Sequence, residues 1–90
     1  MSLKLVCKVQ VKNRLGLHTR PATAIVKLLQ NCKSDVHFIY KRERVNAKSI
    51  LSLLMLAASK NSKITIEVVG DDAKVTMEKL VDAFENQFGE

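Results

Sequence analysis

The fold is decided at Gly16-Leu17-His18-Thr19-Arg20-Pro21-Ala22, where an extended segment is predicted to turn into a helix. Gly16 can adopt backbone angles that are closed to other residues, which permits a sharp turn. Pro21 fits the first helical turn because the N–H that it lacks would have no intrahelical partner there. The helix is therefore predicted to begin near Thr19 to Pro21 and to run to about Asn31.

This turn leaves His18 at the amino end of the helix. The backbone amides of Thr19 and Arg20, together with the positive end of the helix dipole, would attract an anion such as a phosphoryl group. The Arg20 guanidinium would neutralise phosphate oxygens through directed hydrogen bonds. A neutral imidazole offers a nitrogen lone pair for attack. We therefore predict that His18 accepts a phosphoryl group beside Arg20; the plainer alternative is that His18 caps the helix or merely lies on the surface.

Two segments resemble a known family, the histidine-containing phosphocarrier proteins (HPr) of the phosphoenolpyruvate-dependent sugar phosphotransferase system. Their signature Gly-(Leu/Ile)-His-x-Arg-Pro-Ala is matched without a gap at Gly16 to Ala22, and a second family segment is matched by Val45-Asn46-Ala47-Lys48-Ser49-Ile50-Leu51. The resemblance implies that phosphorylated enzyme I passes its phosphoryl group to Nδ1 of His18 and that IIA domains receive it next. It also implies that Thr19 supplies a backbone amide and an interface contact.

The order of elements can be predicted from hydrophobic periodicity. Period-two alternation predicts strands from Leu3 to about Lys12, from Val36 to Tyr40, in a short segment ending near Val45, and from Ile64 to Val68. Helical spacing predicts further helices from Ser49 to Ala58 and, after Gly70-Asp71-Asp72 as a break and acidic cap, along an apolar stripe that reaches Phe88. The order βαββαβα alone also permits a ferredoxin-like arrangement.

The family resemblance implies one of these arrangements. HPr proteins are α+β, two-layer open-faced sandwiches in which a four-stranded antiparallel sheet of order 1-4-2-3 is covered on one face by three helices. We accordingly expect residues 1–90 to form a single HPr-like domain, and a small carrier that shuttles between partners to be a monomer.

The segment from Ser49 to Ala58 is apolar almost all round, so one sheet cannot cover it completely. Ile50, Leu51 and Leu54 are predicted to form a docking patch beside His18, ringed by positive charge that includes Lys48. The resemblance implies contacts of these positions with enzyme I and IIA domains. The alternative is a helix that lies entirely in the core.

Ser49 matches the serine that an HPr kinase/phosphorylase modifies in many bacteria. The resemblance therefore implies regulatory phosphorylation at this position. An ordinary helix cap is the alternative, because serine is favoured there.

The composition of the chain limits which other functions have to be considered. The formal net charge of +6 raises the alternative of a small nucleic-acid-binding module, but aromatic residues make up only 4% of the chain, and Phe38 and Tyr40 are better used as core. Acidic protein partners suit the charge, and we expect no nucleic-acid partner. A further alternative is an HPr paralogue in a regulatory phosphorelay without sugar transport, since Ser52 and the Lys41-Arg42-Glu43 turn depart from residues usual in the family.

The other motifs point to a cytoplasmic protein without a metal or other cofactor. Its apolar runs are too short to enter a membrane, and its first residues lack the apolar core of a signal peptide. Cys7 and Cys32 are predicted to be free thiols because their spacing fits no zinc site. We expect the loop Lys12-Asn13-Arg14 to be solvated; the alternative is that it adds positive potential near His18, with Asn13 bracing the imidazole.

Overall fold

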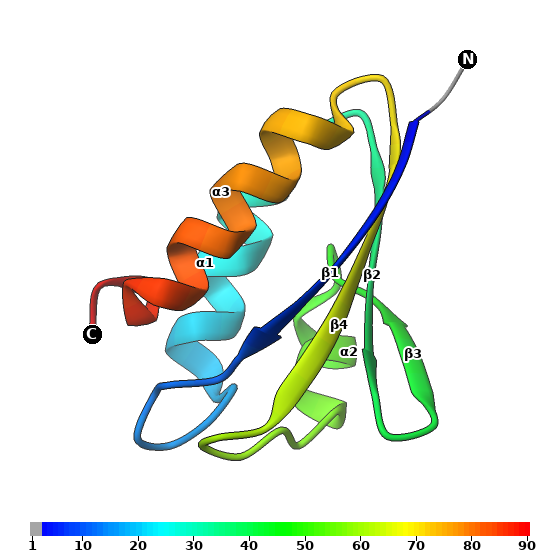
Figure 1. Ribbon diagram of the computed structural model, residues 1–90. Coiled ribbons are helices and arrows are strands. Elements are labelled where there is room, and N and C mark those ends of the chain that lie inside the picture. Colours follow the sequence, from blue (N-terminus) through cyan, green and yellow to red (C-terminus); the bar gives the residue numbers. More distant parts are fainter. Residues whose placement is uncertain (1–2) are drawn as a thin grey trace.

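Four strands form one antiparallel sheet in the computed structural model, which describes residues 3–90 (Figure 1). The strands are β1 (Leu3–Gln10), β2 (Asp35–Tyr40), β3 (Glu43–Asn46) and β4 (Lys63–Gly70). Their order, β1-β4-β2-β3, confirms the predicted sheet order. The first two residues of the predicted 1–90 domain lie outside the described part.

Three helices cover one face of this sheet: α1 (Thr19–Leu29), α2 (Ile50–Met55) and α3 (Ala73–Glu85). Figure 1 shows α1 and α3 on the same side of the strands, while α2 contacts α1 and β3. The core forms between the two layers because alternate strand residues and one stripe of each helix point toward each other. Its largest fully buried apolar side chains include Phe38, Ile64, Ile66, Ile25, Leu29, Leu53, Leu80 and Phe84. The predicted open-faced sandwich is thus confirmed.

Helix α2 is shorter than the predicted span from Ser49 to Ala58. It ends at Met55, and Ala57 adopts a left-handed conformation with φ of 51°. This bend turns Ala58 into the core, where its carbonyl accepts a hydrogen bond from the amide of Leu17. Burial of Ala58 against the turn around Gly16 therefore overrides the helical spacing of the sequence.

Helix α3 also ends earlier than its apolar stripe indicates. It stops at Glu85, and Phe88 belongs to a separate 3-10 turn, η1 (Gln87–Gly89). The Phe88 ring packs edge-on against Phe84, with a centroid separation of 4.9 Å. Gln87 and Phe88 both have positive φ, so the chain bends after α3, and η1 contacts α1.

Asp72 precedes α3, but its side chain does not cap that helix. The carboxylate instead accepts hydrogen bonds from the amides of Lys33 and Ser34, at 2.7 and 2.9 Å, and from the Ser34 hydroxyl. The bond from the Lys33 amide, followed by that from the Ser34 hydroxyl, lowers the pKa of Asp72. The predicted acidic cap is therefore wrong: Asp72 braces the loop between α1 and β2.

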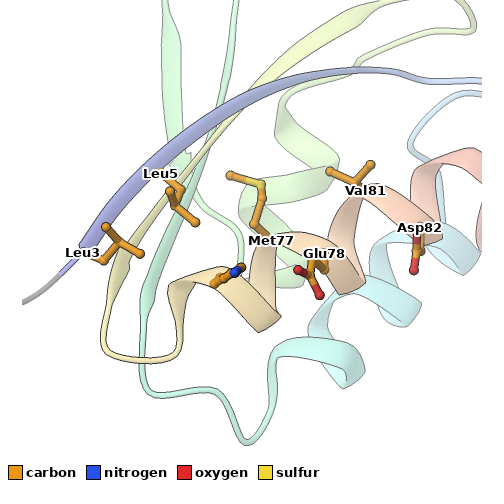
Figure 2. A pocket seen from close by; sticks show the side chains of 7 residues that line it. Leu3, Leu5, Met77, Glu78, Val81 and Asp82 are labelled. Atoms are coloured by element: carbon orange, nitrogen blue, oxygen red, sulfur yellow. The ribbon is translucent and has the colours of Figure 1, made fainter.

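An open groove runs between β1 and α3, as Figure 2 shows. Leu3 and Leu5 form one wall and Met77 and Val81 the other, with Glu78 and Asp82 from α3 also lining it. Among residues 3–90, no helix has the length and apolarity that a membrane crossing needs.

Candidate functional site

The turn before α1 depends on Gly16. Its φ is +71°, and a Cβ atom placed there would lie 2.3 Å from the carbonyl oxygen of Ala58. That carbonyl accepts a hydrogen bond of 2.9 Å from the amide of Leu17, whose side chain is buried. Only glycine allows this approach, which fixes the backbone immediately before His18.

His18 occupies the residue before the first turn of α1, with extended backbone angles. Its carbonyl accepts from the amide of Ala22, but its imidazole makes no capping hydrogen bond. Within residues 3–90, the amides of Thr19 and Arg20 have no hydrogen-bond acceptor. Pro21 has no N–H, so the first helical turn presents these two free donors.

The imidazole of His18 faces a carboxylate that was not predicted from the sequence. Its Nε2 atom lies 3.2 Å from Oε1 of Glu90, and its side chain is 27% exposed. Among the described residues, Nδ1 has no hydrogen-bond partner. Arg20 stands on the other side of the same carboxylate, with its Nε atom 3.8 Å from Oε2 and its side chain 80% exposed.

Asn13 holds this carboxylate in place. Its Nδ2 atom donates to Oε1 of Glu90 and, at 2.8 Å, to the carbonyl of Gln87. Asn13 is fully buried, so the expected solvated loop is wrong at this residue. The alternative prediction was that Asn13 braces the imidazole. Asn13 does so only indirectly, because it binds Glu90, which in turn contacts His18.

Neighbouring charges and partial burial shift the pKa of Glu90 in opposite directions. Desolvation raises the pKa of this carboxyl, but the hydrogen bonds from Asn13 and His18 and the positive charges of His18 and Arg20 together outweigh it. The net result is a pKa below the ordinary value, so the group is an anion near neutral pH. No local motif marks Glu90 in the sequence, because its position depends on the bend of the chain after Glu85.

These residues line one shallow hollow at the amino end of α1. Its walls are Arg14, Leu15, His18, Arg20, Gln87 and Glu90. The hollow therefore combines an imidazole, two guanidinium groups and a carboxylate, beside the free amides at the start of α1. Such a set can bind a phosphoryl group. Residues 3–90 contain no cluster of three His, Cys, Asp or Glu that could hold a metal ion.

Residues 6–86 match the family described as the PTS HPr component phosphorylation site. The chain belongs to the HPr family. It is 44% identical over 80 residues to the phosphocarrier protein HPr of Chlamydia pneumoniae, which covers 89% of this chain and 74% of that protein. A crystal structure of HPr from Thermoanaerobacter tengcongensis superposes with a TM-score of 0.91 at 32% identity, covering 96% and 97% of the two chains. HPr from Bacillus anthracis gives a TM-score of 0.85 at 33% identity, covering 90% and 96%.

Helix α2 of this HPr-family chain is only partly buried. Leu53 lies in the core and Leu54 is half-buried, whereas Leu51 and Met55 are 69% and 73% exposed. The alternative of an entirely buried helix is therefore wrong. Exposed Leu15 and Met55 were not identified from the sequence, because periodicity alone does not tell which apolar face lacks a cover.

A shallow surface connects α2 with the amino end of α1. Thr23 lines one depression with Thr19 and Arg20, and a second with Lys48 and Ile50. The Lys48 ammonium also lies 3.4 Å from the carbonyl of Cys32. Ser49 precedes α2 and its hydroxyl accepts a 3.2 Å hydrogen bond from the Ser52 amide, so the predicted cap is present.

Two positions bear on the other predictions made for this HPr-family chain. Phe38 is completely buried, which removes one of the two rings that a nucleic-acid-binding module could use for stacking.

Lys41 has a φ of 57° in the turn between β2 and β3. Glycine adopts such a left-handed angle without strain, whereas a lysine there is less favourable. Cys7 and Cys32 are free thiols, as predicted.

Proposed function

We propose that this chain is a phosphoryl carrier that accepts a phosphoryl group from phosphorylated enzyme I on Nδ1 of His18 and passes it to IIA domains of sugar transporters. The observation that carries this proposal is the position of His18 at the amino end of α1, where among residues 3–90 neither Nδ1 nor the amides of Thr19 and Arg20 have a hydrogen-bond partner. The carrier works as a cytoplasmic monomer.

The transfer itself needs alignment and charge compensation more than it needs a deep pocket. The Nδ1 lone pair attacks phosphorus while the bond to the donor breaks. The amides of Thr19 and Arg20 and the exposed Arg20 guanidinium bind the phosphoryl oxygens. An open site suits a carrier, because each partner closes over His18 in turn and excludes water.

Incubation with phosphoenolpyruvate and catalytic enzyme I tests the proposed function. We expect one phosphate per chain, labile in acid and stable in alkali, and its transfer to an added IIA domain. Absence of any label would overturn the carrier function. Labelling without transfer to any IIA domain would favour the regulatory phosphorelay, and salt-sensitive RNA binding without labelling of His18 would favour the nucleic-acid alternative.

The exposed side of α2 is the proposed docking patch, formed by Ile50, Leu51 and Leu54. We expect Leu51→Asp to slow transfer from enzyme I by about tenfold or more, because an interface would have to desolvate the new carboxylate. Initial rates of labelling at limiting carrier concentration measure this effect. Adding Lys48→Glu to Leu51→Asp should slow transfer further if enzyme I presents an acidic surface.

Val75→Asp is the matched control for the docking patch. Val75 is an apolar residue of helix α3 and is 48% exposed. The same change there should leave the transfer rate within a factor of about two of the wild-type rate, since most surface substitutions have small effects. Equal rates for the Leu51 and Val75 variants would contradict docking at α2.

Ser49 is the proposed site of regulation by an HPr kinase/phosphorylase. A phosphoryl group would add about −1.5 to −2 charges beside the patch and would repel an acidic partner. With that kinase and ATP, we expect acid-stable labelling of the wild-type chain and of Ser52→Ala, but none of Ser49→Ala. Persistent label on the Ser49 variant would exclude this residue. Loss of the cap should lower stability of that variant by about 1 kcal/mol.

A further inference from the structure

The outer edge of β1 is open for hydrogen bonding. Among residues 3–90 this strand pairs only with β4, so it ends the sheet on one side. Beyond the strand, the amide of Val11 donates to the carbonyl of Ser62, in register with the β1–β4 pairs. Backbone direction alternates along an antiparallel strand, so the odd-numbered residues of β1 face β4. The residues whose N–H and C=O groups face outward, where the described chain has no further strand, are Lys4, Val6, Lys8 and Gln10.

The groove of Figure 2 lies beside this edge. Among the described residues its walls come from β1 and α3 and not from β4, so it opens on the outer side of the sheet. Its apolar residues are incompletely covered: Leu3 is 47% exposed, and Leu5 and Val81 are half-buried. A fifth strand paired with β1 would place every second side chain over this groove. Apolar side chains are favoured there, because they would remove the three residues from water.

The open face of the sheet is basic along the same edge. Because side chains alternate, Lys4 and Lys8 lie on the face opposite to the groove, and both are exposed. The Lys4 ammonium lies 3.9 Å from the carboxylate of Glu67, which Arg44 binds more closely at 3.1 Å. Lys8 forms no ion pair within residues 3–90. An acidic side chain on this face of an added strand would therefore meet two available cations.

The groove itself has the opposite balance of charge. Glu78 and Asp82 line it together with a single lysine, Lys74. A carboxylate placed over the groove would lie beside two like charges, whereas one on the open face would lie beside lysines. The charges therefore distinguish the two faces of an added strand: acidic residues fit one face and apolar residues the other.

We propose that the edge of β1 and its groove bind, as a fifth strand, an extended segment of a partner protein in which acidic and apolar residues alternate. In an antiparallel arrangement, the acidic residues opposite Lys4 and Lys8 are four positions apart. Backbone hydrogen bonds give such a contact its affinity, and the alternating side chains give it selectivity. This binding is separate from phosphoryl transfer at His18.

A second copy of the chain is a less favourable occupant of this edge. It would bring its own Lys4 and Lys8 to the junction, while β1 contributes no carboxylate. Ammonium groups would then gather on the open face and repel one another. Lysines on an edge strand oppose self-pairing in this way, but they attract an acidic strand.

The blocked synthetic peptide Glu-Val-Thr-Val-Glu-Val tests the proposal when it is titrated into nitrogen-15-labelled protein. We expect the amide signals of Val6 and Lys8 to shift as the peptide binds. At a peptide concentration about ten times Kd, hydrogen exchange of these two amides should slow about tenfold, because the bound form does not exchange. The amide of Cys7, which faces β4, should change little.

Two control peptides separate the causes of binding. Glu-Glu-Thr-Val-Val-Val has the same residues without the alternation. The original peptide N-methylated at threonine lacks the N–H that would donate to the carbonyl of Val6. Each should bind about fivefold or more weakly. Equal binding of the N-methylated peptide, or no shift of the Val6 and Lys8 amides with the alternating peptide at millimolar concentration, would overturn strand pairing at this edge.

Variants of the protein test the charges. The double change Lys4→Glu and Lys8→Glu should weaken binding about tenfold, since two attractive cross-strand pairs become repulsive. Lys41→Glu is the matched control, because Lys41 is exposed in the turn next to β3, at the other edge of the sheet. It should bind within about twofold of the wild type. Equal affinities of the two variants would contradict acidic recognition. Shifts of the Val6 and Lys8 amides on concentrating the protein alone would make a second copy the occupant and overturn the proposal.

Discussion

Replacing His18 by alanine is expected to abolish phosphoryl acceptance while the domain stays folded. The imidazole is partly exposed, and its one hydrogen bond within the described chain goes to Glu90, so little packing is lost. No other side chain in the hollow offers a neutral nitrogen nucleophile. Acid-labile labelling by enzyme I should fall by a factor of about 10³ or more, as when a transfer site loses its nucleophile.

His37→Ala is the matched control for this experiment. His37 lies on β2 opposite Glu67 of β4 and Asn46 of β3, and we assign it no role. This variant should be labelled at the wild-type rate, and thermal unfolding should show that both variants are folded. Acid-labile phosphate on His18→Ala, or its loss from His37→Ala, would show that the phosphoryl group is carried elsewhere.

Replacing Gly16 by alanine is expected to destabilise the domain strongly and to displace His18. A non-glycine residue at φ of +71° costs about 1 to 3 kcal/mol from the backbone alone. The added Cβ would also collide with the backbone carbonyl of Ala58, which a side-chain rotation cannot relieve. We therefore expect the free energy of unfolding to fall by about 3 kcal/mol or more. Urea denaturation measures this change.

Gly89→Ala separates the two causes of this loss. Gly89 has a φ of +80°, but a Cβ atom there would have no neighbour within 4 Å. This control should therefore lose only the backbone contribution, about 1 to 2 kcal/mol. Equal losses at the two glycines would contradict the role assigned to the contact between Gly16 and Ala58.

The strands and the start of α1 follow from local sequence. Alternation of apolar residues predicted the buried face of β2, where Val36 and Phe38 are both in the core. Gly16 and Pro21 likewise located the turn and the first helical residues to within two positions. These features are predictable because each depends on backbone angles and periodicity within a few neighbouring residues.

Element ends were less predictable, because contacts distant in sequence determine them. The spacing of apolar residues continues past Met55, yet packing of Ala58 against Gly16 ends α2 there. The exposure of Leu51 also depends on what the neighbouring layers leave uncovered. Periodicity identifies an apolar face but does not supply its partner.

The sequence by itself placed His18 and Arg20 at the mouth of a helix and, through its resemblance to the HPr family, indicated the order of the strands. Only the tertiary structure brought Glu90 to Nε2 of His18 and buried Asn13 beneath it. The physical reason is that a hydrogen bond across 72 residues depends on the direction in which the chain leaves α3. Two left-handed residues, Gln87 and Phe88, set that direction, and no local pattern in the sequence specifies it.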